Sequence, residues 1–232
     1  MSNDHDIGVV GIIGGTGKLG FGLARRWALN GVRVIIGSRT ADKALDAAAQ
    51  LQELAMQRDI HTAEVSGMDN FAAAQAADIV ALTVPFSHQT AILNEIKTAL
   101  QGKILIDTTV PLVPPRVAKV QMPAAGSAAL IAQSVSGPGV RVVSAFQNVP
   151  ADLLQQDHAP DCDILVCGND KDAREQVVAL VRAAGMRGYH AGSLDNATAT
   201  EALTSVLIFI NRYYKGHAGI RLTGIGETSD RA

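Results

Sequence analysis

A glycine-rich turn near the start of the chain constrains its fold more than any other stretch. The apolar residues 9–13, rich in β-branched side chains, predict a buried strand that leads into the turn, and an amphipathic segment follows at residues 21–30. Gly15, Gly17 and Gly20 stand in G-x-G-x-x-G register within this strand, turn and helix unit. We assign them in order to the tight turn, the approach of a pyrophosphate and close helix–strand packing. The unit predicts a dinucleotide site; the alternative is a purely structural turn.

Strands and helices alternate along the chain, which is typical of a parallel sheet with helices on both faces. After the first unit we expect strands at residues 33–37, 63–65, 78–84, 103–107 and 141–146, with helices at 41–58, 70–77, 87–100 and 127–134 between them. A second group follows, with helices at 151–154, 171–184 and 197–215 and strands at 163–167 and around residue 189. The predicted fold class is α/β, a Rossmann-type doubly wound parallel sheet (residues 1–145) with a small C-terminal α/β lobe (residues 146–232).

Composition excludes several classes of partner. The formal net charge is −2 and the chain has no Lys/Arg block, so we expect no nucleic acid and no membrane as partner. The first six residues are polar and acidic, without the pattern of a secretory leader, which favours a cytoplasmic protein. The apolar run at 206–210 is too short to span a bilayer and suits a core or a subunit interface. Cys162 and Cys167 lack the spacing of a zinc or redox pair, which favours buried thiols.

The end of the second predicted strand discriminates between NAD and NADP. An acidic residue that binds the adenosine ribose of NAD is expected about 20 residues after the glycines, but Gly37, Ser38, Arg39 and Thr40 stand there. Ser38 offers a hydroxyl, Arg39 a charged fork, and Lys43 a second cation one helical turn later. These groups suit a 2′-phosphate, so we predict NADP; the alternative is a solvated basic surface. Lys18, within the glycine motif, can reach a phosphate or point to solvent.

The reacting groups should lie where the strands end. In open α/β sheets ligands bind at the carboxyl ends of the strands, so the stretch that includes Val84, Pro85 and His88 should border the nicotinamide. His88 is a weak candidate for proton transfer, and Ala145, Gln147 and Asn148 belong to a predicted floor for a planar ring. These strand ends carry no Ser/Tyr/Lys set, metal-ligand cluster or acid–base pair. The sequence therefore favours hydride transfer between two ring cofactors, with no catalytic side chain.

In the motifs that follow, the chain resembles the NADPH-dependent coenzyme F420 reductases (F420:NADP oxidoreductases). The resemblance runs from about residue 7 to residue 222 and rests on motifs that occur in the family's order: residues 14–20, 37–39 with Lys43, 82–88, 143–145 with 150–151, and 166–170. It implies hydride transfer between NADP(H) and the deazaflavin F420, in a cleft between a Rossmann domain and a C-terminal lobe that closes over the deazaflavin. The resemblance also implies a homodimer with contacts through that lobe.

The resemblance also implies roles for individual residues. The pyrophosphate would be held by Thr16, Gly17, Lys18 and Leu19, and the 2′-phosphate by Ser38, Arg39 and Lys43. Val84, His88 and Ala145 would lie along NADP and the hydride-transfer region, and the helix near Leu207 would close over the deazaflavin.

The chain departs from the family pattern at several positions. Lys18 replaces an expected Asn, Phe86 an expected Trp, and Gln147-Asn148 an expected His-Thr pair on the deazaflavin side. Two enzymatic alternatives remain open: an NADP-dependent reductase of a small carbonyl or imine substrate that uses Lys215 or His88, and a reductase of a flavin. A non-catalytic NADP-binding redox sensor is a third alternative.

Overall fold

The structure is a computed structural model that describes residues 7–61 and 63–225. Residues 1–6, on which the expectation of a chain without a leader rests, lie outside the described residues. Within these two ranges, no helix is both long enough and apolar enough to cross a bilayer.

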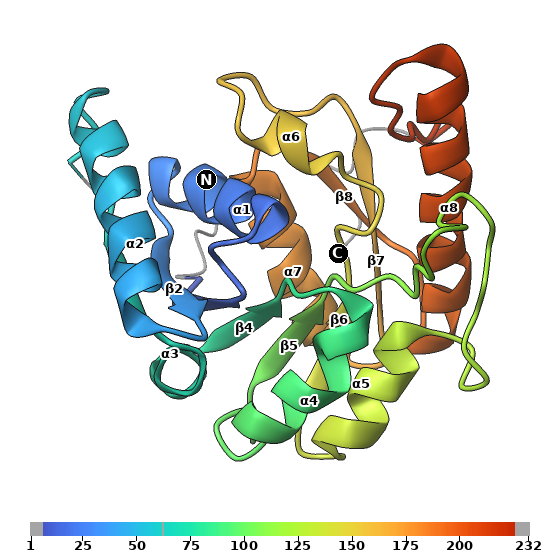
Figure 1. Ribbon diagram of the computed structural model, residues 1–232, viewed down its shortest axis with the longest axis horizontal. Coiled ribbons are helices and arrows are strands. Elements are labelled where there is room, and N and C mark those ends of the chain that lie inside the picture. The colour runs from blue at the N-terminus through green and yellow to red at the C-terminus, as the bar shows by residue number, and fades with distance from the viewer. Residues whose placement is uncertain (1–6, 62, 226–232) are drawn as a thin grey trace.

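Eight strands form one sheet in the order β3-β2-β1-β4-β5-β6-β7-β8 (Figure 1). They are β1 (Val9–Ile13), β2 (Arg33–Ser38), β3 (Val65–Asp69), β4 (Ile79–Leu82), β5 (Ile104–Asp107), β6 (Arg141–Ser144), β7 (Asp163–Gly168) and β8 (Arg187–His190). Strands β1 to β6 are parallel, β7 is antiparallel to β6, and β8 is parallel to β7. The doubly wound parallel sheet is confirmed, and β7 and β8 of the predicted lobe extend it. The division of the chain at residue 145 stays a prediction.

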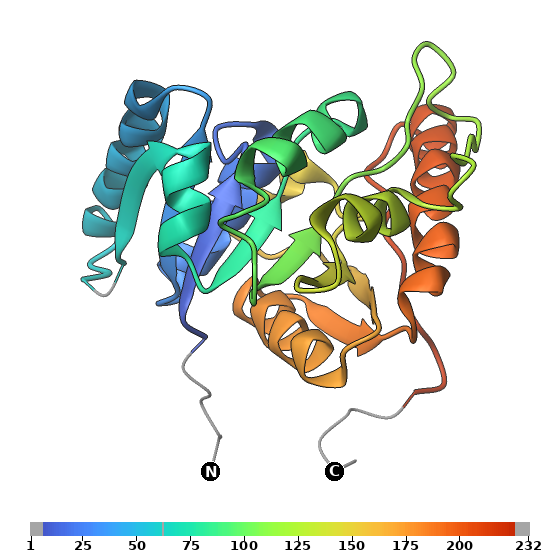
Figure 2. The ribbon, with the colours of Figure 1, turned by 90° about the horizontal axis from the view of Figure 1, so that it is seen from below.

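Helices cover both faces of the sheet (Figures 1 and 2). They are α1 (Lys18–Leu29), α2 (Ala41–Met56), α3 (Asn70–Ala76), α4 (Phe86–Ile96), α5 (Ala128–Ser136), α6 (Ala151–Leu154), α7 (Lys171–Ala183), α8 (Ala197–Tyr214) and the short 3-10 helix η1 (Leu194–Asn196). Buried residues of α1, α2 and α7 share one apolar cluster, and those of α3, α4 and α5 share the other. Because strand-to-helix crossovers change face after β3, the first cluster lies on one side of the sheet and the second on the other.

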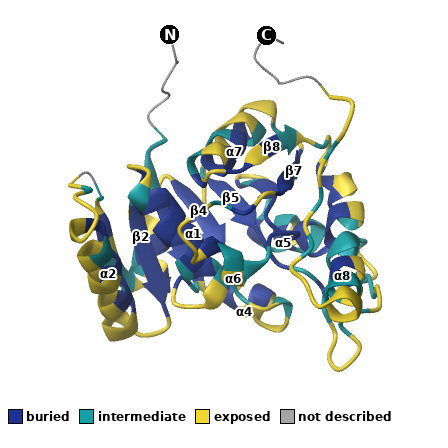
Figure 3. Cartoon of the chain, turned by 90° about the horizontal axis from the view of Figure 1, so that it is seen from above, coloured by how far each residue is buried: buried dark blue, intermediate teal, exposed yellow. Residues whose placement is uncertain are grey.

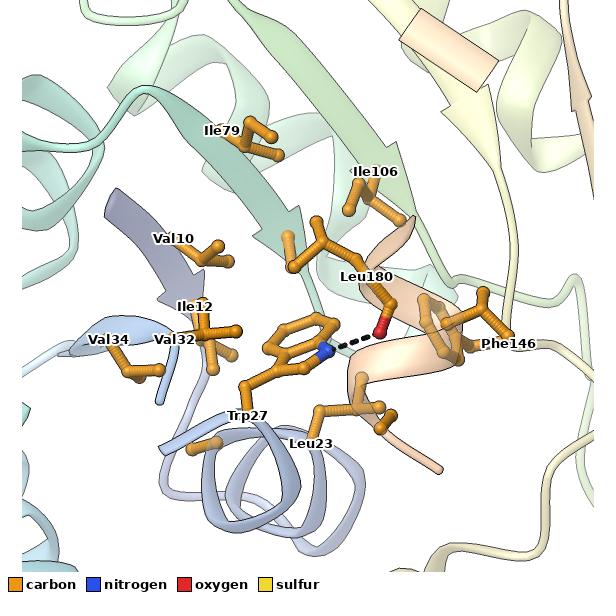
Figure 4. Packing of buried hydrophobic residues seen from close by; sticks show 14 of the residues in the cluster. Val10, Ile12, Leu23, Trp27, Val32, Val34, Ile79, Ile106, Phe146 and Leu180 are labelled. Atoms are coloured by element: carbon orange, nitrogen blue, oxygen red, sulfur yellow. Dashed lines mark hydrogen bonds between the residues drawn. The ribbon is translucent and has the colours of Figure 1, made fainter. Parts of the chain in front are cut away.

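The apolar cluster that contains α1, α2 and α7 joins the N-terminal and C-terminal parts of the chain. Trp27 of α1 is fully buried, and its indole N–H donates to the carbonyl oxygen of Leu180 in α7 at 2.8 Å (Figure 4). Its ring meets Phe146 edge to face, with ring centroids 5.8 Å apart. A buried Trp N–H needs an acceptor, so this bond fixes how α1 lies against the later part of the sheet.

The strand register brings the carboxyl ends of the parallel strands level. Ile13 pairs with both Gly37 and Leu82, Leu82 pairs with Asp107, and Asp107 pairs with Ser144. The loops that follow β1, β2, β4, β5 and β6 therefore all leave the sheet at one edge. Ligands of open α/β sheets bind outside this edge, where the first two strands and the fourth adjoin.

One predicted strand was misplaced. We expected the third strand at residues 63–65, but β3 begins at Val65 and ends at Asp69. Its sequence, Val-Ser-Gly-Met-Asp, lacks the β-branched run that identifies strands. Gly67 is required there because a side chain would overlap the carbonyl group of Ala44, so the packing of α2 decided this stretch rather than strand propensity. Helix α1 begins at Lys18, three residues earlier than expected.

Candidate functional site

The glycine motif holds α1 close against β1. Gly14, one residue before the first glycine of the G-x-G-x-x-G motif, has φ +77°. A Cβ there would lie 2.8 Å from Val84 Cγ1. The sequence did not single out Gly14, which supplies the left-handed conformation of the turn. A Cβ on Gly15 would lie 2.8 Å from the Ile12 carbonyl oxygen, in keeping with the tight turn predicted at Gly15. A Cβ on Gly20 would lie 2.8 Å from the Cα of Gly15. This confirms Gly20 as the residue that permits close packing of the helix on the strand.

The start of α1 presents unused backbone donors. The first bond of the helix runs from Phe21 N to Gly17 O at 2.8 Å. Gly17 at the N-cap has no side chain, and the first turn holds no acidic residue. Among the described residues, the N–H groups of Lys18, Leu19 and Gly20 have no acceptor. Free N–H groups and the positive end of the helix dipole form an anion site at this turn.

A cleft of about 540 Å³ opens beside this turn. Eight of its lining residues were predicted as cofactor-binding: Thr16, Gly17, Ser38, Arg39, Lys43, Val84, Pro85 and His88. Further lining residues are Gly14, Thr40, Asn70, Thr83 and Ile92. The structure therefore brings the loops after β1, β2, β3 and β4 together around one cleft, which runs from the end of β2 across the glycine turn to the start of α4.

Two cations in this cleft lack a carboxylate partner. Arg39 and Lys43 are both exposed, and neither forms an ion pair within the described part of the chain. Lys43 lies in the first turn of α2, where the helix dipole disfavours a positive charge. Ser38, buried at the end of β2, adds a hydroxyl beside them. Such a group of unpaired donors suits a bound phosphate dianion.

The side chains of Lys18 and Leu19 point away from the cleft, whereas their N–H groups lie at the start of α1. The Nζ atom of Lys18 lies 3.0 Å from Asp152 Oδ1 of α6, and both side chains are exposed. The half-buried Leu19 side chain packs on the apolar cluster of α1. Neither side chain lines the 540 Å³ cleft, and the phosphate role of these two residues stays a prediction.

The predicted floor for a planar ring lies deeper than the cleft. Ala145 is fully buried, and the Gln147 amide donates to Ser144 Oγ at 2.8 Å and to the Asp107 carbonyl oxygen at 2.9 Å. The Asn148 amide donates to the Asp163 carbonyl oxygen at 2.8 Å. Both amide groups therefore hold the loop after β6 in place. None of these residues lines the 540 Å³ cleft, and their contact with the deazaflavin stays a prediction.

Helix α8 contacts this loop but does not bring a lysine to the cleft. Thr204 Oγ1 donates to the Gln147 carbonyl oxygen at 2.9 Å, and Leu207 one turn later is buried. Lys215 is exposed at the C-cap of α8 and is absent from the cleft lining. The side chain of Asn211, its predicted neighbour, accepts the N–H of Ala218 instead. The alternative that used Lys215 for a carbonyl substrate has no geometric support.

A buried carboxyl, that of Asp107, ends β5 at the same edge of the sheet. Asp107 Oδ1 accepts from Thr109 N at 3.0 Å and Thr109 Oγ1 at 2.7 Å, while Oδ2 accepts from Gln89 Nε2 at 2.7 Å. Burial raises the pKa of Asp107 to about 6, and the bonds from Thr109 and Gln89 oppose that rise. Gln89 follows His88 in α4, so Asp107 fixes the helix whose first turn borders the cleft.

Sequence reasoning missed a second buried carboxyl, Glu201 of α8. Its two oxygens accept the N–H groups of Ala128 and Ala129 at 2.7 and 3.0 Å, which caps α5 from a distant helix. Burial raises the pKa of Glu201 to about 8, and the charge of Asp107 adds to the rise. No local pattern marks this residue, because a glutamate in the middle of a helix is normally solvated.

Both cysteines are buried, and neither lines the 540 Å³ cleft. Cys162 and Cys167 are buried free thiols, as predicted, and burial raises the pKa of each to about 11. They stay protonated and poorly nucleophilic at neutral pH. In residues 7–61 and 63–225 there is no group of three His, Cys, Asp or Glu side chains able to hold a metal ion.

Together the doubly wound sheet, the anion site at the start of α1 and the unpaired cations after β2 define a class of protein, the NADP-binding oxidoreductases. The comparisons with known proteins narrow the class to a family. Residues 9–111 match the family described as "NADP oxidoreductase coenzyme F420-dependent".

Two curated relatives cover nearly the whole chain. An F420-dependent NADP reductase of Methanocaldococcus jannaschii is 40% identical over 222 residues, which cover 93% of this chain and 98% of that protein. The F420-dependent NADP reductase of Methanothermobacter marburgensis is 38% identical and covers 94% of this chain and 99% of its own. This chain belongs to the F420-dependent NADP reductase family.

A solved structure shares the fold. A chain from Arthrobacter sp. FB24, provisionally assigned as an F420-dependent NADP reductase, superposes with a TM-score of 0.71 at 24% identity. The match covers 90% of this chain and 95% of that chain.

Replacing Arg39 tests the phosphate site. Arg39→Ala should raise the Kd for NADPH by about 10- to 100-fold, since a hydrogen bond to a charged group contributes about 1.5–3 kcal/mol. The Kd for NADH, which lacks the 2′-phosphate, should change by less than about 3-fold. Calorimetric titration measures both constants. Lys97→Ala, at an exposed lysine of the α4 C-cap, is the matched control. An equal loss for both nucleotides would contradict the assignment.

Glu201 should make stability depend on pH. Its pKa lies near 8 in the folded state and near 4.5 when unfolded, so folding favours the protonated form. The stability this contributes is fully present below about pH 4.5 and is lost as the pH rises towards 8. Between about pH 6.5 and 8.5, the free energy of unfolding should fall less for Glu201→Gln than for the wild type, as urea titrations would measure.

The exposed Glu95 of α4 provides the control for this prediction. Glu95→Gln should keep the wild-type dependence on pH. If the curves for the wild type and Glu201→Gln run parallel over this range, Glu201 does not hold its proton in the folded protein.

Proposed function

We propose that the 540 Å³ cleft binds NADPH along the carboxyl ends of β1, β2 and β4 and delivers its hydride to coenzyme F420, the reaction of the family to which the chain belongs. The observation that carries the proposal is the pair of unpartnered cations, Arg39 and Lys43, beside the free N–H groups of α1. One cleft thus holds two groups of anion donors, as the two phosphate-bearing parts of NADP require.

Each part of the cleft has a distinct task in this proposal. The backbone at residues 16–19 holds the diphosphate, while Ser38, Arg39 and Lys43 hold the 2′-phosphate and so select NADP over NAD. Val84 and Pro85, at the end of β4, border the nicotinamide, and the exposed His88 lies beside them. The protein positions the ring and leaves the redox chemistry to the cofactors.

The second ring would approach from the side of the loop after β6 and helix α8. This assignment of Ala145, Gln147, Asn148 and Leu207 is supported by the contact between Thr204 and Gln147, which links α8 to the floor. NADP(H) supplies a hydride from nicotinamide C4 to deazaflavin C5, and the deazaflavin takes up one proton from solvent. No described acidic or basic side chain other than Arg39, Lys43 and His88 lines the cleft, so orientation and exclusion of water are the chain's contribution.

A homodimer is part of the proposal. Helix α8 presents the large apolar side chains Val206, Phe209 and Tyr213, which are 45%, 58% and 70% exposed. Figure 3 shows exposed positions along this helix. Their spacing of three and four residues places them on one face, and the rings of Phe209 and Tyr213 stack with centroids 6.2 Å apart. A self-complementary apolar stripe on one helix suits a two-fold interface with a second copy of the chain.

A cytoplasmic location completes the proposal. It is supported by the two free buried thiols, since disulfides are rare in the reducing cytoplasm.

Turnover tests the reaction itself. Anaerobic mixing of the protein with NADPH and oxidised F420 should bleach the visible absorption band of the deazaflavin, at a rate that saturates in both substrates. NADH should support a kcat/KM lower by about 10-fold or more, because it lacks the phosphate that Arg39 and Lys43 contact. An unchanged band in the presence of tightly bound NADPH would contradict F420 as acceptor.

Sedimentation velocity tests the dimer. The wild type should sediment at twice the 24.2 kDa mass of one chain, and Phe209→Asp should shift it to the monomer. Leu45→Asp is the matched control, because Leu45 is a similarly exposed apolar residue on α2, far from α8 in Figure 1. A dimer that survives Phe209→Asp would exclude the α8 stripe as the interface.

A further inference from the structure

Asn70 has a side-chain amide that the protein uses only in part. It is the first residue of α3, directly after β3, and is 2% exposed. Its Oδ1 atom accepts the N–H of Gly14 at 3.4 Å. Its amide nitrogen has no partner among the described residues, and it is not one of the buried atoms sealed away from solvent. Buried amides normally satisfy both ends, so a free donor on such a residue indicates a missing acceptor.

The orientation of this amide is fixed by its neighbours. The backbone N–H of Gly14 can only donate, so it requires the oxygen of Asn70 rather than the nitrogen. A Cβ on Gly37 would lie 3.2 Å from the same oxygen, which shows how closely the amide lies against β2. The nitrogen therefore lies on the remaining side. Because Asn70 lines the 540 Å³ cleft, that side opens into the cleft.

The register of the sheet locates this donor along the cleft. Gly37 pairs with Ile13 on one side and with Met68 on the other, and Ser38 pairs with Asp69. Asn70 follows β3, on the far side of β2 from β1, but its side chain reaches back past Gly37 to the N–H of Gly14. Its amide therefore lies at the end of β2, close to both the glycine turn, which holds the diphosphate in our proposal, and Ser38 at the 2′-phosphate subsite. The part of NADP that joins those two groups is the adenosine ribose with its 2′ substituent.

We propose that Asn70 is a further specificity residue, whose amide donates a hydrogen bond to the phosphate-bearing 2′ side of the adenosine ribose of NADPH. The inference rests on the proposed function only for the identity of the ligand. A neutral donor there favours an anionic 2′ substituent, whereas a carboxylate would repel it and accept the 2′-hydroxyl of NADH instead. Asn70 therefore adds to Arg39 and Lys43 from the opposite side of the cleft.

Asn70→Asp separates this role from a structural one. The variant keeps an oxygen for the Gly14 N–H, replaces the free donor by an acceptor and adds a negative charge at the first residue of α3, where the helix dipole favours it. Its thermal midpoint, expected close to that of the wild type, checks that the fold is kept. Calorimetric titration should give a Kd for NADPH raised by about 10-fold or more, and a Kd for NADH raised much less or lowered. Asn94→Asp adds the same charge at an exposed position of α4 and should bind both nucleotides as the wild type does.

The outcomes are distinct. If the folded Asn70→Asp variant binds NADPH as the wild type does, the free donor does not face the ligand and the inference fails. If the affinities for NADPH and NADH fall equally, the substitution has disturbed the Gly14 turn, which also overturns a role at the 2′ position. Because neither titration uses F420, failure of the proposed hydride transfer would leave this test intact. A wild type that does not bind NADPH would contradict both the proposed function and this inference.

Discussion

The close approach of α1 to β1 is the constraint on which the rest of this structure depends. The two elements meet at Gly15 and Gly20, where a single methyl group would come within 2.8 Å of backbone atoms. Thr83, directly after β4, lies against Gly20 of α1, and its hydroxyl donates to the Ile13 carbonyl oxygen of β1 at 2.9 Å. If α1 moved outward, its unpaired N–H groups would leave the edge at which the strands end. The anion site, the cleft and the orientation of Asn70 all follow from this one packing distance.

A network of buried polar side chains connects the helices and strand that lie beyond the cleft, at the same edge of the sheet. Glu201 of α8 holds the start of α5, Gln89 of α4 donates to the Ala128 carbonyl oxygen there at 2.9 Å, and Asp107 fixes Gln89 in turn. Such a network stabilises a unique arrangement only when its members are paired, since an unpaired buried polar group is costly. One atom within it, Gln89 Oε1, has no partner among the described residues. The helix that borders the cleft is therefore positioned by polar contacts rather than by apolar packing alone.

Local pattern predicted most of the strands and helices and the half of the site that depends on strand ends. Ser38, Arg39, Val84 and His88 line one cleft because parallel strands bring their carboxyl ends to one edge, which a sequence can reveal. The sequence could not reveal that the amides of Gln147 and Asn148 serve the protein interior, since their acceptors are backbone carbonyls fixed by tertiary structure. Glu201 and Asn70 escaped for the same reason: each is defined by a backbone N–H more than 50 positions away along the chain.

The bond between Trp27 and Leu180 has a consequence for the order in which the chain can fold during synthesis. Trp27 is synthesised early, but the acceptor of its indole N–H, the Leu180 carbonyl oxygen, becomes available only after α7 has left the ribosome. Arg26 likewise waits for the Leu154 carbonyl oxygen, and the N–H of Ala128 waits for Glu201. A nascent chain ending near residue 145 would lack α6 and α7, so the donors of Trp27 and Arg26 and the apolar surface around Trp27 would face water. The packing around α1 is therefore complete only once the C-terminal part of the chain has been translated.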